Sequence, residues 1–512
     1  MKTRARFAIF LAVAVAATLS GPVSASVADR GATAPKGTGE GLTYVKNIKY
    51  EFGTDMELTT INGRDYAFAG SAAPVAQGGG LHVIDITDPA NSHEVAWLKC
   101  SVYQADIQIS FDKKTVIMAS DDAGGPDSCL MAGKLGFLTI DITDPTAPKA
   151  IGMADIPLGS HNVTAHPTKP YVYNSDSELT GPGEIQIWSI ENPAEPKLVN
   201  SVLSAPHSPH DISFNKDGTM AVTAAVSHFD IFNTTDPENP VLVFTDQCPG
   251  CSITHDAKFT PDGGHIFIGD EAGGGAPYPC PGGALYAYEV TGTPVAPVPV
   301  LVGTFEPVVV ASAQGGVGAC TSHVFDISND GKTIVISWYT AGTRLLDVSD
   351  PSMITEIAWF IPEAGDSWSS KFHPRDEGWV FSNDINHGFD VYKIGTGGGG
   401  GGGGGTGGGE TLRGPGLNLI LSDRTPKRGE MLGIKVRLRN CEGHARTFVR
   451  LERSIGSGSS FKAIGRKKVN ADCVARFRDA ADYRKASYRA VWPKQDDDHR
   501  AGRSKAKGVT TH

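Results

Sequence analysis

The sequence predicts an all-β chain in which a seven-bladed β-propeller is followed by a glycine linker and a small β-sandwich. A strand phrase that ends in Asp-Pro or Asn-Pro recurs at steps of 56, 48 and 44 residues. An Asp-Gly turn lies between apolar runs about twenty residues before several of the copies. Periods of about 40–50 residues with several short strands are typical of propeller blades. Thirteen residues, all glycine except one threonine, then separate the repeats from a basic C-terminal region.

The recurring phrase is an apolar, β-branched strand that stops at a turn. Its copies are Ile84–Pro89, Ile140–Pro145, Trp188–Pro193, Ile231–Pro237 and Leu346–Pro351. Proline has no backbone N–H to donate to a sheet, so each strand must end before it. We assign this phrase to the third strand of each blade.

The other strands of a blade follow from the turns around the phrase. Turns such as Asp217-Gly218 lie between apolar runs and predict a hairpin of the first two strands. A fourth strand, such as Lys197–Leu203, follows the Asp-Pro turn. Seven first strands are expected, and they begin near Asp55, Asp106, His161, His210, His255, His323 and Ser370.

The two ends of the repeat region each contain an incomplete set of strands. The last unit stops at Ile394 without a fourth strand, and a spare strand, Tyr44–Phe52, precedes the first unit. We expect Tyr44–Phe52 to pair beside Phe389–Ile394, because this pairing closes the ring and removes exposed sheet edges.

With these motifs the chain resembles the LVIVD-repeat propellers. The resemblance rests on the Ile-Asp-Ile-Thr-Asp-Pro type of ending and the proline-valine run after it, and it covers roughly residues 42–394. It implies the propeller architecture. It implies no single function, because such propellers have many unrelated roles.

The N-terminus has the features of a secretory signal over residues 1–25. A basic segment, Met1–Arg6, is followed by the apolar stretch Phe7–Leu19 and by small residues before a cleavage point after Ala25. The apolar stretch is shorter than the roughly 20 residues that cross a bilayer. We therefore expect an exported, extracellular protein with no membrane span.

Charge differs sharply on the two sides of the linker, residues 395–410. Residues 410–512 contain 24 Lys and Arg against 11 Asp and Glu, whereas the rest of the chain contains 22 against 45. A flexible glycine linker predicts that the two modules tumble semi-independently. The basic module, residues 411–512, is expected either to bind an anionic cell-surface polymer or only to aid solubility and attract the propeller loosely. It contains no motif for specific nucleic-acid binding.

Residues 411–494 are expected to form a small β-sandwich, followed by a disordered tail at 495–512. Alternating apolar and basic residues predict the strands Leu417–Leu421, Gly433–Leu438, Thr447–Glu452, Phe461–Ile464, Cys473–Arg478 and Ser487–Trp492. Cys441 and Cys473 are expected to form its disulfide. The stretch Tyr488–Pro493 resembles the immunoglobulin-like modules that are appended to secreted actinobacterial proteins.

Six cysteines fall in the propeller region and suit an oxidising compartment. They are Cys100, Cys129, Cys248, Cys251, Cys280 and Cys320. We expect a bridge between Cys100 and Cys129. We also expect Cys280 to pair with either Cys248 or Cys251, which leaves the other for Cys320.

Four histidines at one phase of the repeat are the strongest chemical candidates: His161, His210, His255 and His323. They open the inner strands of four consecutive blades, so they are expected at one height beside the central axis. Carboxylates expected to lie beside them, as a second shell or as ligand-binding groups, are Asp55, Asp106, Asp121, Asp176, Asp270 and Asp384. Glu178 and Glu271 follow in the loops.

Neutral imidazoles with carboxylates around them suit Cu, Fe or Zn. The alternatives are a polar organic ligand without a metal, or histidines that only bond neighbouring blades. We therefore expect a protein that binds an unknown ligand or partner at the propeller mouth, supported by a metal ion. A metal-dependent oxidoreductase is the alternative. A lactonase-type hydrolase is less favoured and would need an arginine near the channel, for which Arg344 is the candidate.

Overall fold

The computed structural model describes residues 36–175, 183–204, 209–280, 282–307, 319–395, 417–422, 425–438, 448–455, 462–468, 474–481, 483–492, 502–503 and 507–510. The expected secretory signal lies outside these residues. Strands dominate the described part, and the short 3₁₀ helices are η1 (Val75–Gln77), η2 (Pro89–Asn91), η3 (Cys129–Met131) and η4 (Pro351–Met353). Among the described residues, no helix has the length and apolar character needed to cross a membrane.

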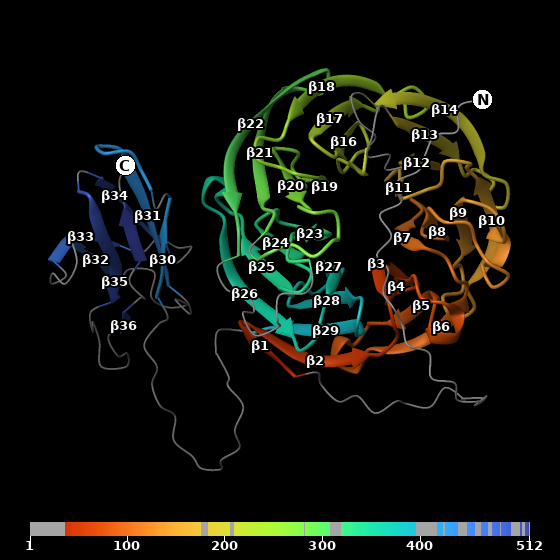
Figure 1. Ribbon diagram of the computed structural model, residues 1–512, viewed down its shortest axis with the longest axis horizontal. Helices are drawn as coiled ribbons and strands as arrows, with labels where there is room; N and C mark the ends of the chain where they lie inside the picture. The colour runs from red at the N-terminus through yellow and green to blue at the C-terminus, as the bar shows by residue number, and fades with distance from the viewer. Residues whose placement is uncertain are drawn as a thin grey trace, which may run out of the picture.

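Residues 36–395 form a ring of antiparallel sheets around a central axis (Figure 1). Blade 1 contains β3 (Gly53–Ile61), β4 (Arg64–Ser71), β5 (Gly80–Asp85) and β6 (His93–Lys99), and blade 2 contains β7 (Gln104–Ile109), β8 (Thr115–Ser120), β9 (Gly136–Asp141) and β10 (Lys149–Asp155). Blade 3 contains β11 (Asn162–Ala165), β12 (Tyr171–Ser175), β13 (Gly183–Ser189) and β14 (Lys197–Ser204), and blade 4 contains β15 (Asp211–Phe214), β16 (Met220–Ala225), β17 (His228–Asn233) and β18 (Val241–Gln247).

The remaining sheets of the ring complete the same pattern. Blade 5 contains β19 (Thr254–Phe259), β20 (His265–Asp270), β21 (Leu285–Thr293) and β22 (Ala296–Phe305). Blade 6 contains β23 (Phe325–Ile327), β24 (Thr333–Ser337), β25 (Thr343–Asp347) and β26 (Thr355–Pro362), with β1 (Gly37–Glu40) added on β26. Blade 7 contains β27 (Ser367–Phe372), β28 (Trp379–Asp384), β29 (Gly388–Ile394) and β2 (Leu42–Ile48). The predicted all-β class is confirmed.

The N-terminal strand closes the ring as expected. Strand β2 pairs antiparallel with β29, from Leu42 opposite Ile394 to Ile48 opposite Phe389. The strand is shorter than predicted. Phe52 adopts a left-handed conformation with φ 53° and donates its N–H to Ile385, so the chain has already turned away from the sheet there.

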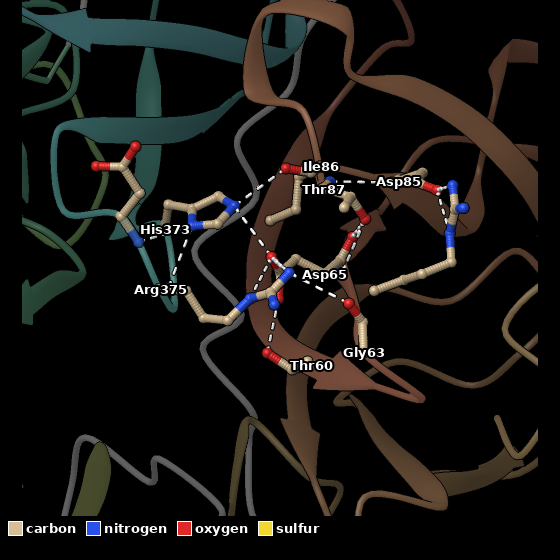
Figure 2. A network of polar contacts seen from close by, with 10 residues as sticks. Thr60, Gly63, Asp65, Asp85, Ile86, Thr87, His373 and Arg375 are labelled. Atoms are coloured by element: carbon tan, nitrogen blue, oxygen red, sulfur yellow. Dashed lines mark hydrogen bonds and ion pairs between the residues drawn. The ribbon is translucent and has the colours of Figure 1, made fainter.

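Side chains also join blade 7 to blade 1 (Figure 2). Asp65 lies at the centre of this junction, where it accepts hydrogen bonds from Arg375 Nε at 2.8 Å and from the Thr60 hydroxyl at 2.6 Å. His373 Nε2 lies 3.0 Å from the carbonyl oxygen of Ile86. The contacts of Arg375 and His373 connect residues more than 280 positions apart and complete the closure of the ring.

Adjacent blades adhere through both apolar and polar contacts. One buried cluster combines Phe68 of blade 1 with Leu138 of blade 2. Aspartates of the inner strands accept hydrogen bonds from the backbone of the next blade. For example, Asp106 Oδ2 accepts the Val163 N–H at 2.7 Å, and Asp326 Oδ2 accepts the Phe372 N–H at 3.0 Å. This repeated contact fixes the inner strands around the axis.

The disulfides agree only in part with the sequence-based expectation. Cys100 pairs with Cys129 as predicted. The predicted pairing of Cys280 with Cys248 or Cys251 is wrong, because Cys248 pairs with Cys251 and Cys280 pairs with Cys320. Cys251 donates its N–H to the Cys248 carbonyl across a tight turn in which Gly250 has φ 97°, so the turn itself brings the two cysteines together.

The C-terminal region contains two sheets that share a buried core with residues such as Val436, Leu451 and Tyr488. One sheet contains β30 (Leu417–Leu421), β31 (Met431–Leu438) and β34 (Val474–Ala480); the other contains β32 (Phe448–Ile455), β33 (Lys462–Lys468), β35 (Lys485–Trp492), β36 (Gly502–Arg503) and β37 (Lys507–Thr510). Strand β37 pairs with β35, so this part of the expected disordered tail is ordered. The immunoglobulin-like identity stays a prediction, and Cys441 and Cys473 lie outside the described residues.

Ion pairs connect the C-terminal sheets to the turn after β25. Arg437 contacts Asp347, and Lys435 Nζ lies 3.7 Å from the same carboxylate. Arg476 Nη1 lies 2.7 Å from Asp350 Oδ2. The opposite charges of the two modules thus bring them into contact, which differs from the semi-independent tumbling that the linker predicts.

Candidate functional site

The four predicted histidines gather in one row beside the axis. His161, His210 and His323 directly precede or lie near the first residues of their inner strands, and His255 lies within β19. The ring centroids are 4.5 Å apart for His161 and His210, 4.1 Å for His210 and His255, and 4.0 Å for His255 and His323. The shared repeat phase therefore predicted their proximity correctly.

Local irregularities of the inner strands help to place these side chains. The register of β19 against β20 shifts between Thr254 and Ala257, so His255 falls in a β-bulge. A similar shift in β7 includes Gln104, which has φ 75° and places its side-chain nitrogen 3.1 Å from His161 Nε2. Left-handed backbone is costly for a residue other than glycine, and such strain is typical of functional sites.

Glu271 supplies the carboxylate at the centre of the row. Its Oε2 lies 3.6 Å from His255 Nε2, and its Oε1 lies 3.7 Å from His323 Nε2. The buried Tyr339 hydroxyl donates to Oε1 at 2.5 Å. His210, His255 and Glu271 each offer one ligand atom, and these three atoms lie within 4.8 Å of one another. The sequence analysis named Asp270, the residue before Glu271, as the carboxylate beside the histidines.

Two of the imidazoles are held in a defined tautomer by partners at Nδ1. His161 Nδ1 lies 2.7 Å from Asp121 Oδ2, and His323 Nδ1 lies 2.6 Å from the carbonyl oxygen of Trp368. Both partners are acceptors, so Nδ1 carries the proton and Nε2 presents a lone pair. Contacts of this kind orient the histidine ligands of metal sites.

Individual separations within the row suit atoms that share an ion, and within the described part of the chain the ligand atoms of His210, His255 and Glu271 are all close to one another, whereas those of His161 and His323 do not join this group. His161 Nε2 and His210 Nε2 are 3.0 Å apart, and Glu271 oxygens lie 3.6 and 3.7 Å from two further imidazole nitrogens. Ligand atoms about 2.1 Å from one metal ion, at angles of about 90–120°, are separated by about 3.0–3.6 Å. The observed contacts lie within or close to this range.

Burial keeps three of the histidines in the neutral form that a metal requires, but it acts against the ionised form of Glu271. It lowers the pKa of His210 and His255 well below the ordinary value, and neighbouring histidines lower it further. Burial lowers the pKa of His323 to about 3, although the bond to the Trp368 carbonyl acts in the opposite direction. Burial raises the pKa of Glu271 to about 7. Neutral imidazole is the form that binds a metal.

The predicted carboxylates take different positions. Asp121 contacts His161 as expected. Asp270 accepts the N–H groups of Ser252 and Ile253, each at 2.9 Å, and so anchors a loop instead of facing the imidazoles. Asp55 and Asp106 line the axial cavity described below. Asp176 and Glu178 lie outside the described residues.

Asp384 belongs to a separate cluster in blade 7 with His387 and Asp390. Asp384 accepts N–H groups from the backbone of Asp366, Asn386 and His387, and its role as a neighbour of the four histidines was wrongly predicted. Asp390 accepts hydrogen bonds from the hydroxyls of Tyr44 and Tyr392. Bonds within the protein thus occupy the carboxylates of this cluster.

Arg344 does not line the channel. It lies in β25, the third strand of blade 6, where Nη1 pairs with Glu356 at 2.7 Å and Nε donates to the Ala341 carbonyl. Its side chain is fully buried. Arg344 therefore cannot act as the channel arginine that a lactonase-type site requires.

A cavity of about 430 Å³ runs along the inside of the ring. At one end it is lined by His255, His323 and Trp368, and at the other by Lys216 and Pro261 of the Asp-Gly hairpin turns. The histidine row is thus connected to the face of the propeller where the first two strands of each blade turn.

Comparisons with known proteins give one family match and two similar solved structures. Residues 65–97 match the LVIVD repeat. The chain carries an LVIVD repeat. The β-propeller domain of Cps50 (Swd1) from Myceliophteria thermophila has 10% sequence identity and a TM-score of 0.49, over 69% of this LVIVD-repeat chain and 99% of that chain. The C-terminal WD40 domain of Sif2 has 9% sequence identity and a TM-score of 0.42, and the match covers 67% of this chain and 81% of that domain. No curated protein matches the sequence.

Proposed function

We propose that this LVIVD-repeat propeller binds one transition-metal ion, Cu, Fe or Zn, at His210, His255 and Glu271, with His161 and His323 as neighbours of this centre. The observation that carries the proposal is the approach of the first three side chains to within 4.8 Å of one another. Imidazole and carboxylate ligands suit these metals. The partners of His161 and His323 at Nδ1 support it, because they direct the Nε2 lone pair of each ring toward the other members of the row.

In this proposal the metal ion holds a ligand that enters from the axial cavity. His255 and His323 line the cavity, so a molecule there lies next to the metal ligands. A metal-dependent oxidoreductase is the second candidate. In such an enzyme the rings of Tyr339 and Trp368, whose centroids lie 4.6 and 4.5 Å from that of His323, would lie beside the metal centre.

The basic module is proposed to attach an exported protein to an anionic cell-surface polymer. The described disulfides are compatible with an oxidising, extracellular location. Exposed cationic residues such as Arg478 and Arg484 are available for such contacts. Attachment of this kind weakens as salt screens the charges.

Metal analysis of the purified full chain tests the central proposal. The protein is stripped with a chelator, reloaded separately with Cu, Fe and Zn, and analysed by mass spectrometry. We expect about one ion per chain in the native protein and in His93→Ala, an exposed histidine on β6, and almost none in the double variant His210→Ala/His255→Ala. Equal metal content in the double variant, or none in the native protein with any of the three metals, contradicts the proposal.

A further inference from the structure

We propose that the axial cavity binds a slender organic cation, a linear diamine or polyamine, through Asp55, Asp106 and Asp326. This would be the ligand that approaches the metal centre from the hairpin-turn face. Its contact with the metal rests on the proposed function, whereas its binding to the cavity does not. The inference rests on charge, on unpartnered atoms and on the shape of the carboxylate arrangement.

The cavity has more carboxylates than cations. Its lining contains five carboxylates and three lysines. Lys371 pairs with Glu57 at 2.7 Å, and Lys258 is bonded to Asp256, a further buried carboxylate. Among the described residues, no ion pair is formed by Asp55, Asp106, Asp211 or Asp326. A cation from outside the chain would balance this charge.

Burial makes negative charge in the cavity costly, and the nearby Lys371 and Lys258 offset only part of this cost for Asp55. Burial raises the pKa of Asp55 to about 6 and that of Asp106 well above its ordinary value, and the neighbouring Asp55 raises the latter further. Isolated carboxylates in a poorly solvated site are stabilised by an opposite charge. An ammonium group among them supplies that charge together with several N–H donors.

One of these three carboxylates has an oxygen atom that lacks a partner in the described part of the protein. Asp55 is only 4% exposed, and its Oδ1 has no hydrogen-bond partner within the described part of the chain. His255 Nδ1, which belongs to another lining residue, is equally buried and unpartnered there. Buried polar groups without partners are rare, and each needs an explanation such as a ligand.

Attachment of one blade to the next does not by itself require these charges. Asp106 and Asp326 each use Oδ2 to accept a backbone N–H of the following blade, Val163 and Phe372 respectively, and Asp326 Oδ1 accepts the N–H of Ile327 in its own strand. An amide oxygen can accept the same bond. Asn162 occupies the corresponding position after His161 in blade 3 and also lines the cavity. The presence of Asn162 shows that this position does not carry a negative charge in every blade.

The arrangement favours an organic cation over a metal ion. A metal site needs three or more ligand atoms around one point. The described residues contain two such groups, and neither includes Asp55, Asp106 or Asp326. The carboxylates come from blades 1, 2 and 6 and line an elongated space of about 430 Å³. A flexible chain with separated ammonium groups can reach several of them at once.

Calorimetric titration of the full chain with 1,4-diaminobutane tests the inference, with 1,4-butanediol as the uncharged probe of the same length. The variant Asp55→Asn/Asp106→Asn removes charge but retains an oxygen that can accept the backbone bonds. Asp155→Asn, whose side chain is 59% exposed at the end of β10, is the matched control. Thermal melting of each variant shows that it is folded, and Asp106→Asn alone replaces the double variant if the latter does not fold.

We expect saturable binding of the diamine to the native protein and to Asp155→Asn at physiological salt, no binding of the diol, and about ten-fold or greater weakening in the carboxylate variant. Binding that is unchanged in the folded carboxylate variant, or absent from the native protein, overturns the inference. Metal content is measured on the same samples. Metal without diamine binding overturns the cavity proposal alone, and diamine binding without metal overturns the metal proposal alone.

Discussion

His387 in blade 7 predicts a pH dependence of stability that can be calculated from its surroundings. Its Nδ1 lies 3.9 Å from Asp384 Oδ1 and 3.7 Å from Asp390 Oδ2, and its side chain is 16% exposed. Burial acts to lower the pKa of His387, but the close contact with Asp390 and the charges of both aspartates outweigh it and raise the pKa to about 9.

The sign follows from proton linkage. A histidine whose pKa is higher in the folded state stabilises that state when it is protonated. The stabilisation is fully present below pH 6.5 and is lost as the pH rises through about 9. At about 1.4 kcal/mol per pKa unit, the rise corresponds to about 3 kcal/mol. Partial solvent exposure screens the charges, so we expect about 1–3 kcal/mol.

Urea unfolding of the propeller at pH 6 and pH 10 measures this contribution. His387→Gln removes the charge, and His93→Gln, an exposed histidine on β6, is the matched control. At pH 6 the His387 variant should be less stable than the native protein by about 1–3 kcal/mol, and at pH 10 the difference should vanish. A constant difference at both pH values, or an equal effect of the His93 variant, would refute the reasoning.

Two further predictions concern the metal centre and the ring. Asp121→Asn should weaken metal binding by about 10–100-fold, because the carboxylate orients His161; unchanged affinity would show that this contact is irrelevant to the site. Deletion of residues 36–48 removes β1 and β2 and exposes the edges of β26 and β29, so it should lower the melting temperature and cause aggregation seen by light scattering. A truncated protein that stays monomeric with unchanged melting would contradict the closure.

The repeat determined which properties were predictable from the sequence. Strands that end at Asp-Pro and hairpins at Asp-Gly follow from local backbone chemistry, so the blades were predicted closely. The proximity of the four histidines followed from their common phase. The pairing of β2 with β29 followed because each end of the repeat region had an incomplete set of strands.

The parts that were missed depend on loops without a repeat. Asp270 and Glu271 are adjacent, and sequence alone does not tell which one faces the axis. In the structure Asp270 bonds the Ser252–Ile253 segment, and the Glu271 N–H donates to Ile253, so the loop directs Glu271 to the histidines. The Cys248–Cys251 pairing likewise depends on one turn.

X-ray absorption spectroscopy of the metal-loaded full chain tests the metal centre most directly. The account predicts about one tightly bound ion with several nitrogen or oxygen ligands at about 2.0–2.2 Å and the scattering pattern of at least two imidazoles. This pattern should be lost in His210→Ala/His255→Ala and kept in His93→Ala. A spectrum without imidazole scattering, or one that the double variant leaves unchanged, would contradict the central claim.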